Sequence, residues 1–189
     1  MHKNLIKPIF SSFLSCEKDM ETILKKLFIE YPKHARELKK LLIINTKDCL
    51  DNPKYDSIVD KFSLKDLIDK GYIRTNTHVK MKEFEEVKSY IYINFDNFTP
   101  NATNMEFRDC NFYFTIICDD ECWDLGDYRQ RPLKIAGYID GLLQGEKLSG
   151  IGECWFSGCT AIADNYFSGY VLAFNAIHGS DDFIPSGTL

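Results

Sequence analysis

Seven cysteines are the residues of this chain best suited to bind a metal or act as nucleophiles. Cys118 and Cys122 are four positions apart, and Cys154 and Cys159 are five apart. Zinc sites use paired ligands at similar spacing, but neither pair has the C-x-x-C spacing of a zinc knuckle. Cys118, Cys154 and Cys159 also fit strand positions, where a buried thiol behaves as a small apolar side chain. We therefore expect core thiols, and a metal held by thiols is the alternative.

A run of acidic residues before the longest predicted helix is the second candidate for chemistry. Carboxylate oxygens bind calcium and magnesium, but the spacing here does not match the calcium loop of helix–loop–helix sites. A solvated loop that ends in a helix cap explains the same residues. The members of this acidic loop are Asp119, Asp120, Glu121, Asp124 and Asp127.

The remaining motifs give no reason to expect an enzyme. The chain has no G-x-S-x-G nucleophile elbow, no phosphate-binding P-loop and no G-x-G-x-x-G dinucleotide motif. The four histidines are scattered, and none lies beside a cysteine that could serve as its nucleophile. We expect neither a catalytic residue nor a bound cofactor.

Composition narrows the class of protein further. The chain has 189 residues, of which 44% are hydrophobic, so it can form one domain with a real core. Its net charge of -5 argues against a nucleic-acid binder that relies on phosphate contacts. No stretch approaches the roughly 18 apolar residues that a membrane span requires, and we expect no membrane association.

The segment 123–145 is the element around which the predicted fold is arranged. An apolar face at helical spacing predicts one amphipathic helix, and Gly145 is placed to end it in a left-handed cap. The helix begins either at Pro132 or near Tyr128 with a bend, and Asp124 and Asp127 are candidate caps. The predicted apolar face consists of Leu133, Ala136, Gly137, Ile139, Leu142 and Leu143.

Strands with alternating patterns flank this helix on both sides. We predict strands at 90–95, 107–118, 154–161 and 170–176, and a polar loop at 96–106. Both faces of 107–118 are apolar or aromatic, as is usual for a strand in the middle of a sheet. The prediction is an α+β fold in which a β-β-α-β-β domain carries a helical N-terminal extension.

Three further helices are predicted before the first strand, at 17–30, 33–44 and 63–71. Ser63 and Asp66 are spaced for the N-terminal cap of the third helix, and Gly71 is placed to end it. The chain then divides into a helical extension at 1–75, an α+β core at 76–178 and an extended tail at 179–189.

The segment from Tyr90 to Ala176 resembles the tail-terminator and head-to-tail joining proteins of tailed bacteriophages. The resemblance lies in the order of IYINF, FRDCNFYFTIICD, WDLGDYRQRPLKIAGYIDGLLQG, a G-x-G turn and GYVLAF. A carboxylate-rich loop, Tyr128-Arg129 and a helix that ends in Leu142-Leu143 match the joint between strand and helix in that family. The Lys-, Asn- and Ile-rich composition resembles that of crAss-like phages.

The resemblance implies a structural virion protein, made in the host cytoplasm, that forms a ring in the phage neck or tail. Such a ring has about six or twelve copies, contacts other neck, portal or tail proteins, and lets DNA pass without specific binding. The acidic loop 119–127 could then face the lumen, where negative charge repels phosphate. The alternative is a small cytoplasmic α+β binding or accessory protein.

The two ends of the chain are predicted to be clasps onto neighbouring subunits. Neither end has a periodic apolar face of its own, and addition of a strand to a neighbour's sheet edge would satisfy backbone groups on both partners. Packing back onto the same chain is the competing account. The apolar anchors available for either contact are Leu5, Ile6, Ile9, Phe10, Phe13, Phe183 and Ile184.

Overall fold

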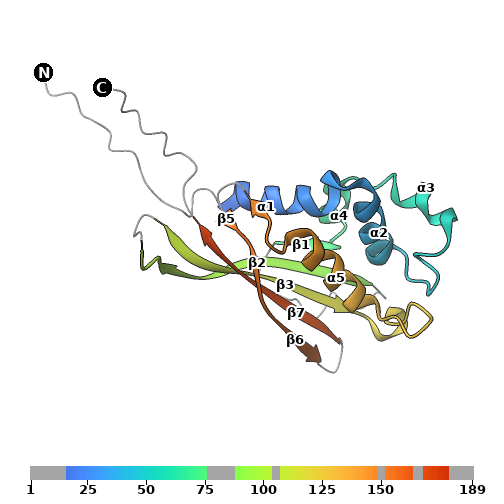
Figure 1. The fold of residues 1–189 in the computed structure, drawn as a ribbon. Helices are drawn as coiled ribbons and strands as arrows, with labels where there is room; N and C mark the ends of the chain where they lie inside the picture. The colour runs from blue at the N-terminus through green and yellow to red at the C-terminus, as the bar shows by residue number, and fades with distance from the viewer. Residues whose placement is uncertain (1–15, 76–87, 104–106, 149–151, 164–167, 179–189) are drawn as a thin grey trace, which may run out of the picture.

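A five-stranded sheet with helices on one side forms the described part of the protein (Figure 1). The computed structural model describes residues 16–75, 88–103, 107–148, 152–163 and 168–178. The helices are α1 (Cys16–Lys25), the π-helix η2 (Lys26–Glu30), α2 (Pro32–Ile43), the 3-10 helix η3 (Pro53–Tyr55), α3 (Asp56–Val59), α4 (Leu64–Asp69), the 3-10 helix η5 (Asp120–Cys122) and α5 (Arg131–Leu143). The strands are β1 (Ile73–Arg74), β2 (Ser89–Pro100), β3 (Arg108–Cys118), β4 (Lys147–Leu148), β5 (Gly152–Glu153), β6 (Trp155–Ala163) and β7 (Ser168–His178).

The large sheet has the strand order β1-β2-β3-β7-β6, and β4 and β5 form a separate two-stranded ribbon. Its pairs are antiparallel except for β1 with β2, which is parallel. The α+β class and the helical N-terminal part are therefore confirmed. The central position predicted for the two-sided strand is also correct, because β3 is the third of five strands.

The two faces of the sheet have different partners. Phe112, Phe114 and Ile116 alternate toward the helices, where they join the main core, and Phe174 stacks on Phe112 with ring centroids 5.3 Å apart. The opposite face has its own small cluster, formed by Tyr90, Tyr92 and Ile117 with Ile162 against it. The guanidinium of Arg74 lies 5.7 Å from the ring centroids of both tyrosines.

Helix α5 begins at Arg131 with Pro132 in its first turn, so the predicted start at proline is correct. Gly145 has a φ of 69° and follows the helix as expected. The predicted caps are wrong, because the N-cap is Gln130 and it makes no side-chain cap. The helix phase also corrects two core residues: Leu133 is 46% exposed and Gly137 faces solvent, whereas Ile135 is fully buried.

Strand β2 is longer than predicted. Asp96–Pro100 continues the strand where a polar loop was expected, because the ladder resumes at Thr99↔Asp109 after a bulge. Asn97 has a φ of 56° within this bulge, a conformation that asparagine tolerates better than most residues.

The N-terminal helices share one core with the sheet. Ile23 and Leu38 from the helices belong to the same buried cluster as Ile91 and Phe114 from the sheet. Helix α4 has the predicted capping box of Ser63 and Asp66. The domain boundaries at 75 and 178 remain predictions. Among the described helices, none is long and apolar enough to cross a membrane.

Candidate functional site

The acidic loop begins with a turn that the sequence of β3 and η5 builds locally. The Asp119 carboxylate accepts a hydrogen bond from the Glu121 N–H at 2.9 Å and so caps the 3-10 helix. The Cys122 N–H donates to the Asp119 carbonyl at 3.1 Å, and the Trp123 N–H donates to the Asp120 carbonyl at 3.3 Å. Because Cys122 is buried, this turn leaves the neighbouring carboxylates of Asp120 and Glu121 in solvent.

The rest of the loop is a tight reversal held by backbone hydrogen bonds. The Leu125 N–H donates to the Arg129 carbonyl, and the Arg129 N–H donates to the Gly126 carbonyl, both at 2.9 Å. Gly126, Asp127 and Tyr128 have φ values of 76°, 49° and 60°. Two consecutive non-glycine residues in this region are unusual, and buried Leu125 anchors the reversal to the core.

Arg131 fixes this loop to the helical layer. The residue is 0% exposed, and its guanidinium donates to four main-chain carbonyls. Nε donates to Cys122 at 2.5 Å, Nη1 to Leu41 and Ile44 at 2.7 Å each, and Nη2 to Thr46 at 2.9 Å. Leu41 is in the last turn of α2, where carbonyls lack helical partners and carry partial negative charge. The buried cation therefore takes the place of a C-terminal cap for α2.

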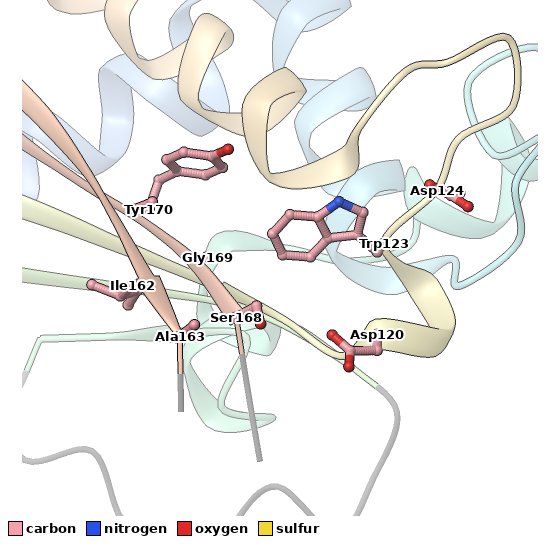
Figure 2. Close-up of a pocket in the computed structure, with 9 residues that line it drawn as sticks. Asp120, Trp123, Asp124, Ile162, Ala163, Ser168, Gly169 and Tyr170 are labelled. Atoms are coloured by element: carbon pink, nitrogen blue, oxygen red, sulfur yellow. The ribbon is translucent and has the colours of Figure 1, made fainter. Parts of the chain in front are cut away.

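The fixed loop forms one wall of an open pocket with a volume of about 490 Å³ (Figure 2). The rings of Trp123 and Tyr170 lie 6.4 Å apart at an angle of 34°. Figure 2 shows both rings turned toward each other and the Asp120 carboxylate near the end of β6 and the start of β7. Small residues such as Ala163 and Gly169 leave room between these groups.

The pocket is suited to a positively charged group with a flat or slender body. Asp120 is exposed and makes no ion pair within the described residues. Asp124 also lines the pocket, but it lies 3.7 Å from Lys47, which offsets its charge in part. An ammonium or guanidinium group can bind both a carboxylate and the face of an aromatic ring.

The structure brings only part of the predicted acidic set together. Asp120 and Asp124 line the pocket, while Asp119 caps the turn. Asp127 lies on the reversal, 3.8 Å from Arg129. Glu121 is exposed on η5. Trp123, Tyr170 and Arg131 were not predicted to have a functional role. The position of Trp123, an aromatic residue within an acidic segment, could have marked it as a candidate. No local sequence pattern connects Trp123 to Tyr170.

The paired cysteines lie mainly in the core. Burial raises the pKa of Cys118 and Cys154 to about 12, and it also raises the pKa of the Cys122 thiol. Metal ligation requires the thiolate, which these surroundings disfavour. Cys159 is a correction to the prediction, because it is exposed on the edge strand β6. In the part of the chain that the structure describes, no three His, Cys, Asp or Glu side chains are grouped for a metal.

The predicted clasps lie outside the described residues. These are Leu5, Ile6, Ile9, Phe10 and Phe13 at one end and Phe183 and Ile184 at the other. Their contact with neighbouring subunits stays a prediction.

Comparisons with known proteins relate most of the chain to one family. No curated protein matches it. A crystal structure from Akkermansia muciniphila is 12% identical, with 90% of this chain and 98% of that chain covered, at a TM-score of 0.30. A similarity that low supports no conclusion about fold or function. Residues 35–176, which include β2, β3, α5 and the acidic loop, match the family model described as YomW. The chain belongs to the YomW family.

Proposed function

We propose that this protein is a structural component of a phage-derived particle, and that copies of it form a ring in the neck or tail. The observation that carries the proposal is membership of the YomW family, a Bacillus phage-derived family. The order of strands and helix that resembles tail-terminator and head-to-tail joining proteins supports the finer assignment. A relation to crAss-like phages remains a prediction from composition.

The surface of the described residues is compatible with a structural role. Ten large hydrophobic side chains are at least 39% exposed, among them Trp155, Phe156 and Ile177 around the start of β6 and the end of β7. Apolar side chains gathered in this way are common where protein surfaces meet. The described cysteines are mostly buried as neutral thiols, which gives no support to nucleophilic catalysis.

In the ring that we propose, the acidic loop faces the lumen. Asp120, Glu121, Asp124 and Asp127 are exposed on one loop, and a negative wall would let DNA pass without sticking. Other neck, portal or tail proteins would be the partners, and the virion the location. No specific contact with DNA is part of the proposal.

Particle mass and images test the ring. We expect purified protein, measured by mass photometry and imaged by electron microscopy, to form closed rings of about six or twelve copies. A chain that stays monomeric or dimeric at all concentrations would contradict the ring. In rings at sufficient resolution, acidic loops on the outer rim would contradict the lumen placement alone.

The pocket favours a second candidate, a small binding or accessory protein that holds a basic group of a partner. Trp123 and Tyr170 supply the aromatic faces and Asp120 the carboxylate. Titration with an arginine-rich peptide, followed by calorimetry, should then show binding that Asp120→Asn weakens and Asp127→Asn does not. Equal affinity of the two variants would contradict this role. Metal analysis of the purified protein tests the thiol-held metal separately.

A further inference from the structure

Strand β6 forms one edge of the five-stranded sheet, and its outer side has no strand partner among the described residues (Figure 1). At its start, the Phe156 N–H donates to Gln144 Oε1 at 2.7 Å. After a bulge between Phe156 and Gly158, the pairing with β7 is regular from Gly158 to Ala163. This regular stretch presents unpaired backbone groups of the kind that accept another strand.

The other free edge of the same sheet is protected in ways that β6 is not. Beyond Tyr92, where β1 ends its pairing, β2 carries Asp96, a bulge with Asn97 at a φ of 56°, and Pro100. Charge, bulges and proline are the usual features that prevent edge-to-edge pairing. Strand β6 contains no charged residue and no proline along its whole length. Its only irregularity lies before the regular stretch.

Apolar side chains continue from β6 onto the surface beside it. Trp155 is 51% exposed and Phe156 is 43% exposed. Trp155 also lines a groove of about 680 Å³ with Phe107 and Ile177. An uncharged strand edge next to exposed aromatic residues is the composition expected of a buried contact.

We propose that β6 pairs in antiparallel fashion with β6 of a second copy of this chain, so that two five-stranded sheets become one. A second copy is the occupant that the strand composition favours. Pairing around a two-fold axis puts the same sequence opposite itself, so any charge near the axis would meet a like charge. Residues 158–163 carry none. The inference goes beyond the proposed ring and does not depend on it.

The regular stretch and the bulge together restrict the register. Directly opposite residues in an antiparallel pair lie on the same face of the sheet. An axis at Thr160 keeps the pairing within the regular stretch: Thr160 meets its own copy, Gly158 meets Ile162 of the second copy, and Cys159 meets Ala161 of the second copy. Apart from Ile162, the side chains at these positions are small, so they do not obstruct the approach of the two strands.

A matched pair of charge substitutions tests the contact. Thr160 and Thr99 are both exposed, and they lie on the two opposite free edges of the sheet. We expect Thr160→Lys, which puts two ammonium groups opposite each other at the axis, to weaken self-association at least about tenfold in analytical ultracentrifugation. Thr99→Lys should leave self-association unchanged. A wild-type chain that never associates, or a Thr160→Lys variant that associates as tightly as wild type, would overturn the proposal.

Cross-linking provides a second readout that does not depend on disrupting the edge. In a Cys159→Ser background, Thr160→Cys should form a disulfide-linked pair under mild oxidation, because opposite residues bring their Cα atoms within disulfide range. Thr99→Cys in the same background should remain unlinked. Linkage of Thr99→Cys with none for Thr160→Cys would refute pairing through β6. Intact rings in which Thr160→Cys stays unlinked would overturn this inference and leave the proposed function standing.

Discussion

Replacement of Arg131 with methionine should destabilise the protein more than any single surface change. Methionine keeps much of the side-chain length but removes all four hydrogen bonds to carbonyls. The bonds to Cys122 and Leu41 are fully buried, and those to Ile44 and Thr46 are partly buried. The partly buried carbonyls can turn to water, whereas the two buried ones lose their partner outright.

The magnitude follows from these two groups. A hydrogen bond from a charged donor contributes about 1.5–3 kcal/mol, so two buried ones amount to about 3–6 kcal/mol. Relief from burying the cation offsets part of this, and we expect a net loss of about 2–5 kcal/mol. A typical domain has only about 5–15 kcal/mol of unfolding free energy. The variant should therefore unfold at a much lower denaturant concentration.

Arg129 provides the matched control from the same loop. Its guanidinium pairs with Asp51 on the surface, and such pairs contribute about 0–1 kcal/mol. Its bonds to the carbonyls of Gly126 and Leu125 are longer, at 3.4 and 3.2 Å, and only partly buried. Urea unfolding followed by circular dichroism compares Arg131→Met with Arg129→Met, and Arg131→Lys tests whether charge alone is enough. A single lysine ammonium group cannot reach all four carbonyls that the Arg131 guanidinium contacts. Arg131→Lys should therefore recover less than half of the unfolding free energy that Arg131→Met loses. Equal unfolding midpoints for Arg131→Met and Arg129→Met would refute the assignment of Arg131 as the cap of α2.

Four further predictions concern the core, one glycine, the thiols and acid stability. Phe114→Ala should lower the free energy of unfolding by about 3–5 kcal/mol, because Phe114 is fully buried between Phe112 and Phe174. Leu133→Ala, at an exposed position, should lower it by less than about 1 kcal/mol, and similar melting temperatures of the two variants would contradict this. Gly169→Ala should destabilise the protein by at least about 2 kcal/mol, since its Cβ would lie 1.8 Å from the Ile116 carbonyl oxygen. Gly137→Ala, on the open face of α5, should stabilise it by about 0.5–1 kcal/mol, and the melting temperatures of the two variants test both expectations. In native protein treated with a maleimide at neutral pH, Cys159 should be labelled. Cys110, Cys118 and Cys154 should stay unlabelled, because burial raises the pKa of each of these thiols to about 12. Mass spectra that show early labelling of Cys118 would contradict this prediction. The pair with Lys40 lowers the pKa of Asp56 below its ordinary value, so its contribution is present above about pH 4 and is lost as the pH falls through the lowered pKa; Asp56→Asn should show a shallower loss of melting temperature in acid than wild type.

The periodicity of apolar residues predicted the layers of the fold well, because this periodicity depends on which residues are buried. The alternation of Phe112, Phe114 and Ile116 reports one buried face directly, and the apolar residues on the other face place β3 at the centre. The phase of α5 was harder to predict. Leu133 and Ile135 are both apolar, and only the start of the helix at Arg131 decides which of them faces the sheet.

Long-range geometry explains what the sequence did not reveal about the site. Arg131 contacts carbonyls about ninety residues earlier in the chain, and backbone acceptors leave no mark on the residue types that carry them. Trp123 meets Tyr170 only because β7 pairs with β3 and begins beside η5. The acidic loop was visible as composition, yet the reversal within it depends on the positive φ values at 126–128, which the residue types alone do not predict.

The pocket and the proposed pairing edge share the end of β6, and their geometry makes them compatible. Ile162 belongs to the pocket wall and also lies two residues from the axis at Thr160. In the proposed register, Gly158 of the second copy lies opposite Ile162, and glycine has no side chain that could reach the pocket. Trp123 and Asp120 stand on the loop that Arg131 fixes, away from the edge. A pair of copies would therefore display two open acidic pockets, and each could hold a basic group in the proposed binding role.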